Sequence, residues 1–197
     1  MDPSGHVIGK YRKIHLPGHA EEDPKRMFQH LEKRYFDVGN LGFKVWKAMD
    51  GLIGILICND RRWPEAFRVL GLQGVELVLI GYNTPTLNGL LFEPPHLRAF
   101  HNHLSMQAGA YQNGTWVVGV AKAGREEGVD MMGHSVIISP TGEIVAQSLT
   151  LEDELIVAKC DLEAGRYLRE TTFDFAAHRR PEHYGLIVET TGAVPPK

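Results

Sequence analysis

Cys58 is the residue of this chain best placed to act as a nucleophile. It follows an apolar, β-branched run at 52–57, which predicts a buried strand. Pro64 and Glu65 follow closely and favour the start of a helix. A sharp strand-to-helix turn leaves backbone N–H groups free beside the side chain, and nearby cations stabilise a thiolate. The pattern therefore places a thiol beyond the carboxyl end of a strand, where open α/β folds carry their reactive groups.

The same cysteine could instead be a small buried hydrophobic residue that ends a strand. The polar cluster directly after it weighs against this interpretation. Asp60, Arg61 and Arg62 follow the predicted buried strand, and buried charges are costly unless they are paired. Their presence favours a functional site over plain core.

Two segments upstream of Cys58 carry further polar side chains. A strand predicted at 6–14 puts Tyr11, Lys13 and His15 on one face by alternation, although a solvated basic edge strand fits equally well. The long polar loop at 18–34 holds His30 and Glu32, either as part of a functional loop or as ordinary surface residues.

Downstream of Cys58, a second apolar strand is predicted at 75–80. Asn83 and Thr84 follow its carboxyl end and are candidates to share a cleft with Cys58, although the pair could form a plain turn. His101 lies within a helix predicted at 96–112, where histidines are more often packed or solvated than catalytic. Further strands are expected at 43–47, 116–122, 134–139, 143–148 and 155–162, and further helices at 66–73 and 163–168.

The whole chain has the composition of one globular domain. Its 197 residues are 43% hydrophobic and carry a formal net charge of −3, with a pI near 6.4. This balance gives no reason to expect binding to nucleic acid or to an anionic membrane. No apolar run is long enough to span a bilayer, and no signal peptide is evident, so a cytoplasmic protein is expected. Two distant cysteines without a CxxC spacing predict neither a disulfide framework nor a zinc site.

Five strings in order along the chain resemble the nitrilase, or carbon–nitrogen hydrolase, superfamily. They are GKYRKIHLP, ILICNDRRWPE, GYNTP, SMQAGAYQNGTW and SPTGEIVA. Within the superfamily they are most similar to the N-carbamoyl-D-amino acid amidohydrolases, over nearly the whole chain. The resemblance implies an α/β fold, a four-layer αββα sandwich of the nitrilase type. It also implies a hydrolase domain over 1–189 with a loose tail at 190–197.

The resemblance also implies roles for the residues noted above. It makes Cys58 the nucleophile, Lys13 the cation of the catalytic triad, and Glu32 an auxiliary glutamate near both. It implies no metal and no cofactor, a small N-carbamoyl amino acid as substrate, and a homo-oligomer in the full-length form. The substrate-binding residues that it implies are Arg61 and Arg62 for the carboxylate, Asn83 and Thr84 as further contacts, and His15, His30 and His101 around the pocket.

One departure from the family pattern affects the expected activity. The general-base glutamate of the family belongs to a segment that would precede Met1, so the fold is expected to be incomplete on its N-terminal side. The chain is then expected to correspond to the C-terminal two-thirds of the family domain, with little activity by itself. Hydrolysis of an N-carbamoyl-D-amino acid remains the main expectation. Another amidase of the superfamily, a β-ureidopropionase and a non-catalytic assembly partner are the alternatives.

Overall fold

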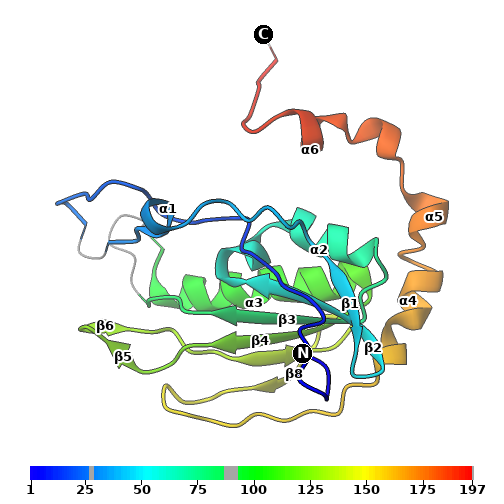
Figure 1. Ribbon diagram of the computed structural model, residues 1–197, viewed down its shortest axis with the longest axis horizontal. Coiled ribbons are helices and arrows are strands. Elements are labelled where there is room, and N and C mark those ends of the chain that lie inside the picture. The colour runs from blue at the N-terminus through cyan, green and yellow to red at the C-terminus, as the bar shows by residue number, and fades with distance from the viewer. Residues whose placement is uncertain (27–28, 87–92, 197) are drawn as a thin grey trace.

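A computed structural model describes residues 1–26, 29–86 and 93–196, and its centre is a six-stranded mixed sheet (Figure 1). Two pairings are parallel, β2 with β3 and β3 with β4, while β1, β7 and β8 pair antiparallel with their neighbours. In the order of the sheet the strands are β1 (Val45–Ala48), β2 (Gly51–Ile57), β3 (Leu77–Tyr82), β4 (Trp116–Ala121), β7 (Val136–Ile138) and β8 (Ile144–Gln147). A separate two-stranded hairpin joins β5 (Arg125–Glu126) to β6 (Val129–Asp130).

Two helices, α2 (Pro64–Gly71) and α3 (Pro95–Asn113), cover one face of the sheet (Figure 1). The alternate residues of the parallel strands that point to this face are buried and form the core together with the helices. The helices lie very close together, since a Cβ added to Gly109 would come within 2.7 Å of the Phe67 ring. The core residues include Leu56, Val78, Ile80 and Val117 from strands, and Phe67, Leu70, Met106 and Ala110 from helices.

The C-terminal quarter of the chain is a series of short elements. Figure 1 shows them, in orange and red, following one another away from the sheet. Arg169 anchors their start, because its Nη1 donates to the carbonyl oxygen of Gly114 at 2.6 Å. The elements are η2 (Leu162–Gly165), α4 (Arg166–Glu170), α5 (Phe175–His178), η3 (Pro181–His183) and α6 (Gly185–Glu189).

Most of the predicted elements are confirmed within a few residues, but two predicted strands are wrong. The segment at 6–14 is irregular, because its backbone finds no neighbouring strand among the described residues to form a ladder. The segment at 155–162 is irregular up to the start of η2, and its alternate apolar side chains face solvent, with Leu155 87% and Val157 77% exposed. Of the four layers expected for an αββα sandwich, the described residues form one helix layer and one large sheet.

Within the described ranges, no helix combines the length and the apolar character needed to cross a membrane.

Candidate active site

Cys58 lies at a strained turn between β2 and a short 3-10 helix, η1 (Cys58–Arg62). Its φ is +49°, a left-handed conformation that side chains other than glycine rarely adopt. Such a conformation costs roughly 1–3 kcal/mol and persists only where the surroundings enforce it. The first N–H groups of a helix have no partner inside it, so they are available to an anion beside the thiol. Cys58 itself is 8% exposed and borders the core, so the turn holds a largely buried thiol beyond the end of a strand.

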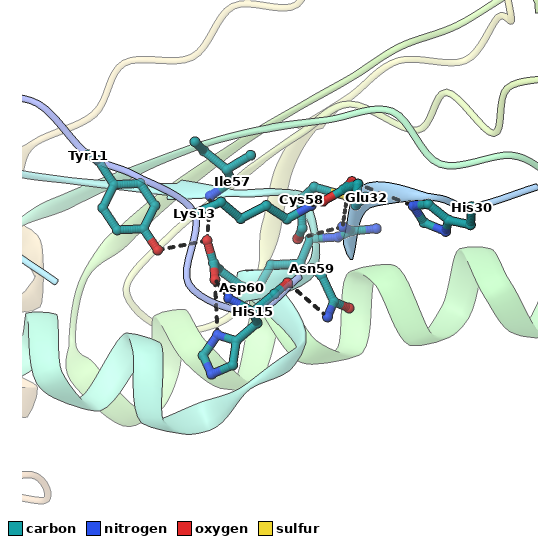
Figure 2. Close-up of polar contacts among 10 residues, drawn as sticks. Tyr11, Lys13, His15, His30, Glu32, Ile57, Cys58, Asn59 and Asp60 are labelled. Carbon is teal, nitrogen blue, oxygen red and sulfur yellow. Dashed lines mark hydrogen bonds and ion pairs between the residues drawn. The ribbon is translucent and has the colours of Figure 1, made fainter. Parts of the chain in front are cut away.

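Lys13 and Glu32 form a close ion pair beside this turn. Lys13 Nζ lies 2.5 Å from Glu32 Oε2, and the two side chains are 11% and 22% exposed. Glu32 opens the short helix α1 (Glu32–Tyr35), and its other oxygen, Oε1, lies 3.5 Å from His30 Nε2. Burial lowers the pKa of His30, while the neighbouring Glu32 opposes that shift. In Figure 2 the Lys13 side chain points toward Glu32, on the side of the site where Cys58 lies.

Asp60 is fully buried and accepts four hydrogen bonds. Its Oδ1 accepts from the backbone N–H and from Nδ1 of His15, both at 2.9 Å. Its Oδ2 accepts from the Tyr11 hydroxyl at 2.8 Å and from the Ile57 N–H at 3.1 Å. Burial, reinforced by the bond to Asp60, raises the pKa of Tyr11 far above its ordinary value. The carboxylate therefore joins the segment that carries Lys13 to the end of β2 (Figure 2).

Arg61 is an interior residue, with 1% of its surface exposed. Its guanidinium donates to three oxygen acceptors, lies 4.0 Å from the Cys58 Sγ through Nη1, and stacks 3.9 Å over the Tyr82 ring. Burial lowers the pKa of this group. The three acceptors are the carbonyl oxygen of Cys58 at 2.7 Å, Oδ1 of Asn102 at 2.7 Å and Oγ1 of Thr84 at 3.1 Å. The structure thus places Arg61 behind the nucleophile, as a support of the turn.

The other expected site residues fall into two groups. Arg62 and Asn83 are exposed, each at the end of an element that borders the turn of Cys58. His101 is also exposed, and its described contacts are an ion pair with Glu93 at 2.6 Å and a ring contact with Phe100. Glu93 lies just before α3 and Phe100 within it, and none of the contacts among the described residues joins His101 to the Lys13–Glu32 pair.

Asn102 is a supporting residue that the sequence did not single out. It is fully buried on α3, accepts from Arg61 and donates to the Tyr82 hydroxyl at 3.1 Å. Asn102 lies four and eight positions before the buried residues Met106 and Ala110, and this helical spacing is the signal that could have found it. A polar side chain on such a buried face must find partners.

The described residues contain no group of side chains typical of a metal site. In the parts of the chain that the structure describes, no three His, Cys, Asp or Glu side chains are grouped so that they could hold a metal ion. The second cysteine, Cys160, is partly buried outside this site, and burial raises the pKa of its thiol.

Comparison with known proteins gives consistent matches. A family model described as carbon-nitrogen hydrolase matches residues 1–170. An N-carbamoylputrescine amidase from Solanum lycopersicum is 32% identical over an alignment of 206 positions, gaps included, which covers 100% of this chain. A citrullinase from Francisella tularensis is 32% identical over an alignment of 198 positions, gaps included, which covers 95% of this chain.

Solved structures agree with the sequence matches. A carbon-nitrogen hydrolase from Helicobacter pylori superposes with a TM-score of 0.80 at 26% identity, covering 93% of this chain and 62% of that one. The NitFhit protein of C. elegans superposes with a TM-score of 0.76 at 25% identity, covering 91% of this chain and 40% of that one. The chain spans 64% of the tomato relative's length and 63% of the citrullinase's. The α/β fold is therefore of the nitrilase type.

Proposed function

The chain belongs to the carbon–nitrogen hydrolase family, and we propose that it hydrolyses a non-peptide C–N bond with Cys58 as the nucleophile. The observation that carries the proposal is the placing of Cys58 at a left-handed turn, φ +49°, with the Lys13–Glu32 ion pair held beside that turn. The turn holds the thiol beyond the end of a strand, and a positioned ammonium stabilises negative charge next to a thiolate.

The proposed chemistry has two steps on a carbamoyl group. The Cys58 thiolate attacks the carbamoyl carbon, an Sγ–C bond forms, and the C=O electron pair moves onto oxygen. The Lys13 ammonium and the backbone N–H of Asn59 stabilise that oxyanion. The C–N bond then breaks, and the leaving nitrogen takes a proton. Glu32, the carboxylate paired with Lys13, orients the ammonium and takes part in proton transfer.

Water completes the reaction by attacking the carbonyl carbon of the acyl-enzyme and releasing the thiol. For a substrate R–NH–CO–NH₂, one water is consumed and R–NH₂, carbon dioxide and ammonia are formed. The names of the two relatives support a substrate of this type, since N-carbamoylputrescine and citrulline both end in a ureido group.

An N-carbamoyl amino acid, specifically the D-isomer, is the substrate that we propose within this class. Arg62 supports it, because an exposed guanidinium beside the turn of Cys58 matches a carboxylate with two parallel hydrogen bonds. Asn83, exposed at the end of the neighbouring strand, is a further contact. Arg61 is left out of this role, because its donors already hold three interior acceptors. N-carbamoylputrescine has no carboxylate and would not use Arg62 in this way.

The test is ammonia release from four ureido compounds offered to the purified protein. They are N-carbamoyl-D-phenylalanine, its L-enantiomer, citrulline and N-carbamoylputrescine. We expect slow release from the D-isomer, none from Cys58→Ala, and the wild-type rate from the matched control Cys160→Ala. Equal activity of the two cysteine variants would remove Cys58 from the mechanism, and a preference for N-carbamoylputrescine would overturn the carboxylate substrate.

A further inference from the structure

The segment that carries Lys13 is held to the turn of Cys58 mainly by one carboxylate, and Asn59 Nδ2 adds a bond to the His15 carbonyl oxygen at 3.2 Å. Tyr11 lies two residues before Lys13 and His15 two residues after it, and both donate to Asp60, which lies two residues after Cys58. These bonds join residues that are far apart in the sequence, since Tyr11 is 49 residues and His15 is 45 residues from Asp60. Lys13 is thus bracketed on both sides by ties to the same buried group (Figure 2).

Apart from these ties, the described contacts of Lys13 are one backbone hydrogen bond and the ion pair with Glu32. The segment at 6–14 is irregular and makes no strand ladder, although the Gly39 N–H donates to the Lys13 carbonyl at 2.8 Å. A lysine ammonium on four flexible bonds is a mobile point charge unless its stem is fixed. The side-chain bonds to Asp60 fix the two residues that flank it.

The same carboxylate also bonds the backbone at the end of β2, directly before Cys58. Asp60 Oδ2 accepts both the Tyr11 hydroxyl and the N–H of Ile57, the residue directly before Cys58. The His15 ring is further confined by stacking on Phe43 and Trp63, with centroids 5.8 and 5.0 Å away. The turn of Cys58 and the segment that carries Lys13 therefore share Asp60 as a partner, beside the contributions of Arg61 to the turn and of Glu32 to the ammonium.

We propose that Asp60 is a positioning residue that sets the Lys13 ammonium against the Cys58 thiol. The inference rests on the roles proposed above for Lys13 and Cys58. Asparagine cannot replace the carboxylate, because only one of its two terminal atoms accepts hydrogen bonds. In one orientation of the amide, its NH₂ group would face the Ile57 N–H and the Tyr11 hydroxyl. In the other orientation, it would face the two donors of His15.

The test is the rate at which iodoacetamide alkylates Cys58 at neutral pH, measured by mass spectrometry of peptides with Cys160 as the internal reference. This rate reports thiolate reactivity and needs no substrate, so it is independent of whether the protein hydrolyses any ureido compound. Lys13→Met defines the rate without the ammonium, which we expect to be about tenfold or more below wild type. Asp60→Asn should fall to within about threefold of Lys13→Met, because a displaced ammonium no longer stabilises the thiolate.

Glu76→Gln is the matched control. Glu76 is also a partly buried carboxylate that accepts a backbone N–H, from Leu52 at 2.8 Å, but it does so at the opposite end of β2. Its variant should alkylate at the wild-type rate even where its unfolding midpoint falls. Where hydrolysis is measurable, Asp60→Asn should lower kcat more than it raises KM, because the binding residue Arg62 is unchanged.

The outcome that overturns the proposal is an Asp60→Asn protein that loses stability yet alkylates Cys58 at the wild-type rate. Should Asp60→Asn fail to fold, by circular dichroism, Tyr11→Phe and His15→Ala carry the test, because each removes one side-chain bond and keeps the carboxylate. Each should then slow alkylation about two- to fivefold, and wild-type rates in both would exclude a positioning role.

Discussion

Replacing Arg61 by methionine tests whether Arg61 stabilises the fold or binds the substrate. Methionine keeps much of the side-chain volume and removes the charge and the donors. The change leaves three interior acceptors without a partner: the Cys58 carbonyl, Thr84 Oγ1 and Asn102 Oδ1. It also removes the contact of the guanidinium with the Tyr82 ring.

The magnitude follows from these contacts. Hydrogen bonds to a charged group contribute about 1.5–3 kcal/mol each, and an unsatisfied buried acceptor costs about 1–3 kcal/mol. The variant also avoids the several kcal/mol that burying a charge costs, which offsets part of the loss. We expect the free energy of unfolding to fall by about 3–5 kcal/mol, a large share of the roughly 5–15 kcal/mol of a typical domain.

The assay is urea unfolding of Arg61→Met and of Arg62→Ala side by side. A loss of that size lowers the urea midpoint of Arg61→Met by about 2 M, given m-values of about 1–3 kcal/mol/M. Arg62 is exposed, so its variant should stay within about 0.5 kcal/mol of wild type. It should instead lose about 1.5–3 kcal/mol of transition-state binding, roughly ten- to 150-fold in kcat/KM, for substrates with a carboxylate.

A particular result would refute this reasoning. If Arg61→Met unfolds at the wild-type midpoint and loses activity only toward substrates with a carboxylate, its guanidinium reaches the ligand and the interior assignment is wrong. Equal losses of Arg62→Ala toward a carboxylate substrate and toward its amide analogue would reject the carboxylate contact.

Three further predictions concern the nucleophile, the Lys13 segment and pH. Cys58→Ala should abolish ammonia release while the free energy of unfolding changes by no more than about 1 kcal/mol, because only one buried sulfur is removed. Gly39→Ala should cost about 1–3 kcal/mol of stability and slow hydrolysis, since its Cβ would lie 2.1 Å from the Arg12 carbonyl oxygen, next to Lys13; urea unfolding and ammonia release measure both. Burial lowers the pKa of His103 below 6.5, although its hydrogen bond to the His134 carbonyl opposes the shift. As the pH drops below about 6.5, His103 therefore takes up a proton more readily in the unfolded chain than in the folded one. Stability should therefore fall as the pH drops through 6.5, and His103→Gln should weaken that fall in urea midpoints measured across this range.

Each of these predictions has a contrary result. Ammonia release by Cys58→Ala would require another nucleophile. Gly192→Ala is the control for Gly39→Ala, because nothing lies within 4 Å of its added Cβ, and equal effects of the two would remove the steric argument. A pH dependence that is unchanged in His103→Gln would assign the acid sensitivity to other groups.

The sequence by itself determined the elements around Cys58. The apolar run before the cysteine, Pro64 after it and the apolar pattern of α2 are local signals, and local periodicity is sufficient to predict a strand, a turn and a helix. The five motif strings led to the same family that the family model identifies over residues 1–170. The parallel sheet follows from the same signals, because a helix between two apolar strands brings their carboxyl ends together.

Only the tertiary structure decided what the polar side chains around the turn do. Arg61 and Arg62 are adjacent in the sequence and equally charged, but one is 1% exposed and the other faces solvent, which depends on the packing of α3 against η1. The alternation of Tyr11, Lys13 and His15 suggested a strand. Their segment is instead held by Asp60, through partners 45 and 49 residues apart. No local pattern encodes such contacts. A buried carboxylate must accept hydrogen bonds, and the fold decides which segments lie close enough to donate them.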